Sequence, residues 1–267
     1  MSRIKSWFKR TPLYPVLRAM RDVFRTRSPH DRIEARDARA TRRILRTLLR
    51  PDDNCIDVGA HAEDVLAECL RLAPRGTHAA VEPIPYLAAA LRARFPGVEV
   101  HHAAATDTNG PLEFTVVISA PAFSGIRRRP DLAPDLPTET VRVLGMRLDD
   151  LIPPDRPIRL LKIDVEGAEL GVLRGAARLL ARWRPWVLFE HGSAAAVYGT
   201  TTADVFAELS RHGLSIWTLP GWIAGDPPLT CEGLIAAVAS GDYWNFLAGV
   251  ATGPLPTDAT LPAERPE

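Results

Sequence analysis

Short apolar runs alternate with helical patterns from residue 54 onwards, and this alternation predicts an α/β domain. The runs are bounded by Gly, Pro and polar residues and are too short for helices, so they predict strands. The predicted strands cover residues 55–59, 77–82, 98–101, 112–118, 140–144, 158–164, 185–191, 213–219 and 243–249. Helical spacing of apolar residues predicts helices over residues 61–72, 85–95, 168–182 and 201–211. Strands that alternate with helices indicate a mostly parallel sheet.

The two ends of the chain differ from this domain. Residues 31–50 predict a helix with apolar residues on one side, and residues 1–27 place bulky apolar residues at helical spacing between arginines. Residues 1–27 have two interpretations: an amphipathic helix on an anionic membrane surface, or a helix that packs its apolar stripe onto the domain. The end of the chain, rich in Pro and charge, predicts a flexible tail. The predicted division is a basic helical extension 1–50, a domain 51–251 and a tail 252–267.

Charge is distributed unevenly along the 267 residues, although the net charge is only +1. Residues 1–50 contain 15 Lys and Arg against 4 Asp and Glu, and the rest contains 18 against 28. No recognised motif accompanies the basic arm, so we expect no nucleic-acid partner. The three cysteines lack metal-ligand spacing, no apolar run is long enough to span a membrane, and no signal peptide is evident. We therefore expect a cytoplasmic protein, with peripheral membrane contact through residues 1–27 left open.

The first predicted strand ends in a glycine turn, Asp57-Val58-Gly59-Ala60-His61, and the second ends in Glu82. A strand, a glycine turn, a helix and a strand that ends in an acid form a typical nucleotide-binding arrangement. A dinucleotide needs further glycines, and the acids at positions 63 and 64 would repel its pyrophosphate. A cationic sulfonium ligand with an adenosine part suits this acidic turn better. The residues expected to hold it are Asp57, Gly59, His61 and Glu82, the last through ribose hydroxyls.

Acidic residues also follow the predicted strand at residues 158–164. Lys162, Asp164, Glu166 and Glu169 lie within eight residues, where a strand gives way to a helix. Helix capping accounts for the two glutamates, but an acid at the end of a buried strand is costly without a partner or a function. Because ligands bind beyond the carboxyl ends of such strands, this cluster predicts a site. Asp107 lies in a loop of small residues, where contact with adenine and turn initiation are both open interpretations.

The segment from Lys162 to Glu169, Lys-Ile-Asp-Val-Glu-Gly-Ala-Glu, resembles the FkbM-type methyltransferase family. Further matching blocks are Ile56-Asp57-Val58-Gly59-Ala60, Val81-Glu82-Pro83 and Leu148-Asp149-Asp150-Leu151. The resemblance implies an α/β fold with a class I methyltransferase Rossmann-like sheet, mostly parallel with an antiparallel last strand, behind an N-terminal helical extension. It also implies S-adenosyl-L-methionine as cofactor. The reaction it implies is methyl transfer, typically O-methylation of a hydroxyl on a sugar, a glycan or a polyketide-type natural product.

Roles follow for the acids at the predicted sheet edge. Asp164 and His191 each end a strand and are the candidates for general base. We expect the acceptor, a small molecule or a glycan, to meet Lys162, Glu166 and Glu190. Asp164, Glu166 and Glu190 have an alternative role as ligands of a divalent cation, but their spacing does not demand a metal and none is predicted. Glu166 and Glu169 have another, as partners of Lys162 and Arg174.

The glycine turn departs from the family pattern, because His61 and Glu63 stand where Asn and Gly are usual. This departure leaves a second functional class open, a degenerate, non-catalytic module that docks a partner or a membrane surface through its basic arm. A nicotinamide dehydrogenase is disfavoured by the missing glycines. Two Pro-rich loops, residues 120–137 and 220–228, are expected to shape the acceptor pocket, and three consecutive arginines at 127–129 are candidates to meet an anionic acceptor or to be solvated.

Overall fold

A computed structural model describes residues 28–61, 64–129, 132–133 and 135–251, and the chain divides into two compact units, Met1–Ala38 and Arg39–Glu267. The first unit is described only from residue 28, where helix α3 (Pro29–Leu48) begins. A reciprocal cap starts this helix: Asp31 N–H donates to Ser28 Oγ, and Ser28 N–H donates to the Asp31 carboxylate. The predicted helix at 31–50 is therefore confirmed. The expectations for residues 1–27 and for the tail lie outside the described residues.

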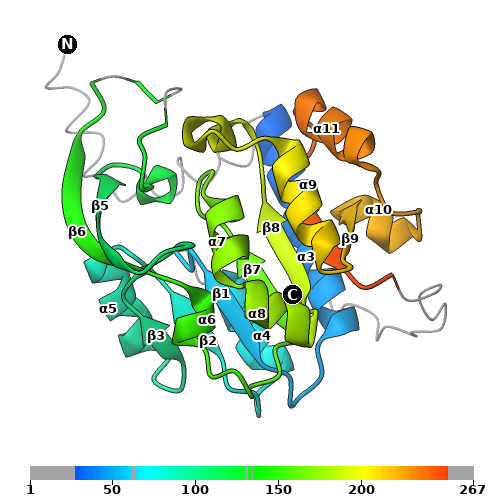
Figure 1. The fold of residues 1–267 in the computed structure, drawn as a ribbon, viewed down its shortest axis with the longest axis horizontal. Coiled ribbons are helices and arrows are strands. Elements are labelled where there is room, and N and C mark those ends of the chain that lie inside the picture. The colour runs from blue at the N-terminus through cyan, green and yellow to red at the C-terminus, as the bar shows by residue number, and fades with distance from the viewer. Residues whose placement is uncertain (1–27, 62–63, 130–131, 134, 252–267) are drawn as a thin grey trace, which may run out of the picture. The chain divides into compact units, whose positions relative to one another are not determined.

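A seven-stranded sheet in the order β3-β2-β1-β7-β8-β10-β9 forms the centre of the second unit (Figure 1). Its strands are β1 (Cys55–Val58), β2 (Ala79–Val81), β3 (Glu99–His101), β7 (Leu160–Ile163), β8 (Trp186–Glu190), β9 (Ser215–Thr218) and β10 (Asn245–Gly249). Strand β10 runs antiparallel to both of its neighbours, and the other pairs are parallel. The predicted mostly parallel sheet with an antiparallel last strand is confirmed.

Helices cover both faces of this sheet. Alternate residues of each strand point to opposite faces, so apolar side chains on both faces are buried under helices. One face carries α6 (Leu148–Leu151), α7 (Glu169–Gly175), α8 (Ala177–Trp183), α9 (Thr202–Arg211) and α11 (Cys231–Ser240). The other carries the second half of α3, α4 (Asp64–Leu72), α5 (Pro85–Arg94) and α10 (Leu219–Ala224). Leu161 of β7 packs on the first face, whereas its neighbour Leu160 packs on the second. Burial on both faces explains why these strands read as continuous apolar runs.

A smaller three-stranded sheet, in the order β4-β6-β5, lies beside the main one (Figure 1). It consists of β4 (Ala104–Ala105), β5 (Gly110–Val117) and β6 (Thr138–Met146), with β5 and β6 antiparallel. The β5–β6 loop, residues 118–137, contains the short helix η1 (Pro121–Phe123) and returns to β5, where the backbones of Thr115 and Gly125 exchange two hydrogen bonds. The predicted strands at 112–118 and 140–144 are confirmed, and the long loop between them is a feature of the smaller sheet.

The predicted single helix over residues 168–182 is wrong, because the chain breaks it at Ala176 into α7 and α8. The break coincides with a close backbone approach: a Cβ on Gly175 would lie 2.0 Å from the carbonyl oxygen of Thr106. The turn after β4 of the smaller sheet therefore packs directly against the helix backbone at Gly175, which has no side chain. This tertiary contact sets the boundary between α7 and α8. The helical spacing of apolar residues continues through the boundary, so the sequence pattern does not indicate it.

The predicted irregular loop at residues 220–228 is also wrong, because its first half is helix α10. Thr218 caps this helix, Pro220 lies in its first turn, and Gly225 ends it at a φ of +78°. These are ordinary start and stop signals. Its Trp222 packs edge-on against Trp186 of β8, so this segment belongs to the core. Across the described part of the chain, no helix is long and apolar enough to cross a membrane.

Candidate functional site

The carboxyl ends of four parallel strands bring the predicted site residues to one edge of the main sheet. Gly59 follows β1, Glu82 follows β2, Asp164 follows β7, and Glu190 ends β8. These strands are neighbours in the order β2-β1-β7-β8, so residues from distant parts of the chain lie side by side. This is the edge at which open α/β sheets bind ligands.

Because Gly59 has no side chain, the ends of β1 and β7 approach each other closely at this residue. Its φ is +74°, and a Cβ there would lie 1.8 Å from the carbonyl oxygen of Asp164. Gly59 N–H donates to Val81, and Asp164 N–H donates to Val58, so the three strand ends are held together. His61 follows at intermediate exposure, whereas residues 62 and 63, including the predicted departure at Glu63, lie outside the described residues.

Lys162 neutralises two carboxylates at the centre of this edge. It stands directly opposite Asp57 in the β1–β7 register, and its Nζ lies 3.3 Å from one carboxylate oxygen of Asp57 and 3.3 Å from one of Asp164. The same Nζ donates to the carbonyl of Gly59 at 3.2 Å. Burial opposes the charge of Lys162, but the two carboxylates outweigh it and raise its pKa. These three contacts are all with protein oxygens, which suits holding the edge together better than reaching an acceptor.

Glu82 is buried at the end of β2 and presents a carboxylate with one oxygen in use. Its Oε1 accepts the N–H of Ile84 at 2.8 Å, and no described residue hydrogen-bonds its Oε2. Burial raises the pKa of Glu82 to about 7, against the opposing hydrogen bond from Ile84. A buried carboxylate with a vacant acceptor oxygen fits the predicted contact with ribose hydroxyls.

Asp107 lies apart from these acids. It is exposed in the turn between β4 and β5, and its backbone nitrogen lies next to Gly171 of α7. Within the described ranges, no hydrogen bond or ion pair joins it to Glu82 or Asp164. The turn around it is closed by Thr106, whose hydroxyl donates to the carbonyl of Thr108 at 2.5 Å. This bond joins Thr106 and Thr108 and not the side chain of Asp107, so turn initiation by Asp107 and contact with adenine both stay predictions.

Three carboxylates converge beyond β7 and β8. Oxygens of Asp164, Glu166 and Glu190 all lie within 4.8 Å of one another. Glu166 has a φ of +54°, rare for a side-chain-bearing residue, and its carboxylate accepts from Arg129. Burial raises the pKa of Glu166 to about 7, and it raises that of Glu190, with help from the neighbouring acids, to about 9. Near neutral pH the group therefore retains at least one proton.

Protein cations already balance two members of this carboxylate group. Lys162 pairs with Asp164, and Arg129 pairs with Glu166, leaving Glu190 without a cationic partner among the described residues. The group has the spacing of a divalent cation site, but a metal ion would compete with both of these cations. This balance agrees with the expectation from the sequence that no metal is needed, which stays a prediction.

His191 is buried behind the edge, and both of its ring nitrogens have partners. Nδ1 lies 3.4 Å from Glu169, and Nε2 lies 3.1 Å from the hydroxyl of Thr202. The other oxygen of Glu169 accepts the N–H of Gly167 at 2.7 Å. His191 and Glu169 therefore hold the turn between β7 and α7 against α9. The geometry gives His191 a positioning role and leaves Asp164, with a side chain 36% exposed, as the accessible candidate base.

Several predicted pairings are wrong. Glu166 pairs with Arg129 and not with Lys162, and Glu169 contacts His191 and not Arg174, which lies 3.9 Å from Glu208. These glutamates are held by residues from other elements. Strand and helix periodicity gives no information on such long-range partners.

The β5–β6 loop reaches the site through the three consecutive arginines. Arg127 donates from its side chain to Val197 O and from its backbone to the Tyr198 hydroxyl, both in the short helix η2 (Ser193–Tyr198). Arg128 donates to carbonyls of its own loop, and Arg129 donates to Glu166. All three arginines contact protein oxygens, so a purely solvated run, one of the two interpretations left open, does not describe them. Sequence reasoning missed the role of Arg129; its only signal was a basic triplet in a long loop.

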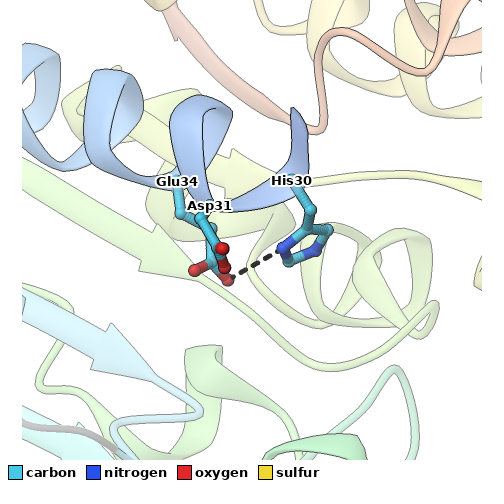
Figure 2. A group of neighbouring side chains, drawn as sticks. All are labelled: His30, Asp31 and Glu34. Atoms are coloured by element: carbon cyan, nitrogen blue, oxygen red, sulfur yellow. Dashed lines mark ion pairs between the residues drawn. The ribbon is translucent and has the colours of Figure 1, made fainter. Parts of the chain in front are cut away.

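A second group of possible metal ligands, His30, Asp31 and Glu34, lies at the start of α3 (Figure 2). All three are exposed in the first unit. Asp31 is the helix cap described above, and His30 lies 3.6 Å from Glu34 one turn later. Capping and a pair four residues apart account for this group as an ordinary helix start, and we assign it no ligand.

Comparison with known proteins connects this edge to methyl transfer. The family described as "Methyltransferase FkbM domain" matches residues 57–216, which is more than half of the chain. None of the curated proteins matches the sequence. The matched segment begins at Asp57 and includes all residues of the site described here.

Solved structures with similar backbones are methyltransferases of low sequence identity. A precorrin-6y C5,15-methyltransferase from Geobacter metallireducens GS-15 is 14% identical, covers 68% of this chain and 72% of its own, and gives a TM-score of 0.40. A SAM-dependent methyltransferase from Aquifex aeolicus is 11% identical, with 83% and 97% covered and a TM-score of 0.41. A sugar N-methyltransferase from a Streptoalloteichus species is 12% identical, with 80% and 85% covered and a TM-score of 0.40.

Proposed function

Because this chain belongs to the FkbM methyltransferase family, a family of S-adenosylmethionine-dependent enzymes, we propose that it methylates a hydroxyl oxygen of a sugar, a glycan or a polyketide-type natural product. The observation that carries this proposal is the partly exposed carboxylate of Asp164. It lies between the glycine turn after β1 and the carboxylates of Glu166 and Glu190.

The residues present fit S-adenosylmethionine. The turn at Gly59 has no side chain, Glu82 offers a vacant carboxylate oxygen for ribose hydroxyls, and the edge is rich in acids that favour a cationic sulfonium. When bound, the cofactor supplies an electrophilic methyl group. We assign Asp57, Gly59, His61 and Glu82 to holding it. Lys162 keeps Asp57 and Asp164 in place by pairing with both.

Asp164 acts as the general base in this proposal. Methylation of a hydroxyl forms an oxygen–carbon bond, breaks the sulfur–carbon bond and releases the hydroxyl proton, which passes to the Asp164 carboxylate. The carboxylate is already fixed by Lys162, so it needs little reorganisation. Glu166 and Glu190 lie within 4.8 Å and are able to share the proton afterwards.

The same edge supports a neutral, hydroxyl-bearing acceptor. Carboxylates accept hydrogen bonds from hydroxyl groups and repel anionic groups such as phosphate. Glu166 and Glu190 would orient neighbouring hydroxyls of a polyol, which favours a sugar or glycan within the proposed classes. The non-catalytic alternative is less favoured, because the family match includes the complete Lys162-to-Glu169 segment.

The test compares wild type with Asp164→Asn on a panel of sugars, glycans and hydroxylated polyketides, with S-adenosylhomocysteine release as the readout. We expect turnover on at least one neutral hydroxyl acceptor, and Asp164→Asn should lower kcat by about 100-fold or more. Cofactor affinity, measured by calorimetry, should change far less. Turnover of the variant at the wild-type rate would contradict the role of Asp164.

His191→Gln is the matched comparison, because His191 is the other sequence-based candidate for the base. Its buried ring and its two partners predict a loss of stability with an unchanged pH profile of kcat. A loss of kcat as large as that of Asp164→Asn, with the acidic limb of the profile removed, would assign the base to His191. Absence of binding by folded wild type for both adenosyl ligands would instead support the non-catalytic class.

A further inference from the structure

Four arginines form a line along the exposed side of α3 and the residues just after it. Arg39, Arg43 and Arg46 lie on α3 at spacings of four and three residues, which places them on one face of the helix, and Arg50 follows just past its end. All four are exposed. The opposite side of the helix packs its buried residues Ile44, Leu45 and Leu48 into the core on one face of the main sheet. We call this line of four residues the arginine stripe.

Most of the positive charge of the arginine stripe is not balanced by the protein. Arg46 lies 3.7 Å from Glu68 of α4. For Arg39, Arg43 and Arg50, no side-chain ion pair exists with any residue that the structure describes. Arg42 is also exposed, on the flank of the stripe. The helical part of the stripe, from Arg39 to Arg46, spans about 10 Å at the rise of an α-helix and presents a cationic edge to solvent.

We propose that the arginine stripe docks the protein on the surface of an anionic phospholipid membrane. A straight row of arginines faces a plane of headgroup phosphates with all its members at once, and each arginine near such a surface adds to the attraction.

A nucleic acid is the other polyanion to consider, and the stripe fits it less well. Single strands are bound through aromatic side chains that stack on bases between the basic residues. Residues 39–50 contain no aromatic residue. The acidic remainder of the chain, with 28 Asp and Glu against 18 Lys and Arg, would also repel any polyanion that extended past the stripe. A membrane requires contact with one face only.

The experiment is flotation of the full chain with vesicles of phosphatidylcholine alone and of phosphatidylcholine with 30% phosphatidylglycerol. We expect wild type to float with the anionic vesicles, to lose this binding as salt rises, and to leave neutral vesicles unbound. The triple variant Arg39→Gln, Arg43→Gln, Arg50→Gln should bind the anionic vesicles roughly 10- to 100-fold more weakly. It spares Arg46, so the ion pair with Glu68 stays intact.

Two controls separate charge position from total charge and from folding. The triple Lys variant at the same positions keeps the charge and should retain most of the binding. Arg142→Gln with Arg182→Gln and Arg211→Gln removes the same number of charges from exposed sites outside the stripe and should bind as wild type. S-adenosylmethionine affinity of every variant, which does not depend on the stripe, reports that the fold is preserved.

The proposal is overturned if the Gln variant at 39, 43 and 50 floats as well as wild type, or if both Gln triples lose binding equally. It is also overturned if wild type ignores anionic vesicles but binds an oligonucleotide whose affinity depends on these three arginines. In that case the stripe would be a nucleic-acid surface. None of these results bears on methyl transfer, so this proposal and the proposed function fail independently.

Discussion

The sheet edge that carries the candidate site has two sides, one assigned to the cofactor and one assigned to the acceptor, and each accommodates buried charge differently. On the cofactor side, Asp57 and Asp164 share Lys162, and all three residues lie on or directly after neighbouring strands of the main sheet. On the acceptor side, Glu166 depends on Arg129 from a loop of the smaller sheet, and Glu190 has no cation among the described residues. The charges of Asp57 and Asp164 are balanced by a residue of the main sheet, whereas the charge of Glu166 is balanced by a residue of a loop.

This difference separates a rigid half from an adjustable half. A buried carboxylate needs a partner, and a partner in strand register is fixed by the backbone. A partner from a loop is held only by its own contacts, here those of Arg127 with the residues around Tyr198. We therefore expect changes on the cofactor side to cost more stability, and changes on the acceptor side to affect turnover and pH dependence.

The largest expected effect is that of Lys162→Met. Without its cation, Asp57 stays buried beside Asp164, and breaking such a buried pair lowers the free energy of unfolding by roughly 3–5 kcal/mol. Urea denaturation at pH 7 measures this loss. Arg75→Met is the matched control, because it breaks the exposed Asp52–Arg75 pair and should leave stability nearly unchanged. Equal effects of the two variants would contradict the role given to Lys162.

Gly59→Ala should have the next largest effect. The substitution places a Cβ 1.8 Å from the Asp164 carbonyl oxygen at a φ of +74°, so the ends of β1 and β7 must separate. The backbone conformation alone costs roughly 1–3 kcal/mol. We expect lower stability together with at least tenfold weaker S-adenosylmethionine binding, roughly the cost of a displaced contact. Gly97→Ala, where no atom lies within 4 Å of the new Cβ, should change neither quantity.

Glu190→Gln tests the acceptor side through pH. Folding raises the pKa of Glu190 from 4.5 to about 9, so between these values the folded state binds more protons than the unfolded state. The contribution of Glu190 to wild-type stability is therefore greatest at low pH and falls as pH rises through this window. Removing the group should make the variant gain about 2 kcal/mol relative to wild type between pH 5 and pH 7.

The same titration distinguishes a shared proton from a metal ion. A bound divalent cation would hold Glu190 ionised, and the trend with pH would then reverse. Urea curves recorded with and without a chelator should coincide, and activity should survive chelation. A loss of activity that is restored by Mg²⁺ or Ca²⁺ would show that the carboxylate group binds metal, against the prediction from charge balance.

Arg129→Met should have the smallest effect on stability, about 1–2 kcal/mol, because the arginine is partly solvated and its loop is held by other contacts. Glu166 then loses its cation, so its pKa rises further and the acidic limb of the kcat profile should move to higher pH. S-adenosylmethionine affinity should stay within about twofold, well below one tenfold step. Arg128→Met, which removes hydrogen bonds to the loop carbonyls of Ala133 and Leu136, is the control and should leave the pH profile unchanged.

The sequence predicted the elements that periodicity specifies. The strands that end at Gly59, Glu82, Asp164 and Glu190 were recognised because burial on both faces makes them continuous apolar runs between turn residues. Helix α10 had clear signals in Thr218, Pro220 and Gly225, and its prediction as a loop gave too much weight to prolines. The break at Ala176 had no such signal, because it depends on a backbone contact with Thr106.

The sequence by itself determined the α/β architecture, the family and the sheet edge that carries the site, because these follow from periods of two and 3.6 residues and from contiguous motifs. Only the tertiary structure decided which charges meet. It paired Lys162 with Asp57 and Asp164, gave Arg129 to Glu166, and enclosed His191 between Glu169 and Thr202. The physical reason is that a buried charge must find its partner in space, and strand register and loop return bring together residues that are far apart in the chain.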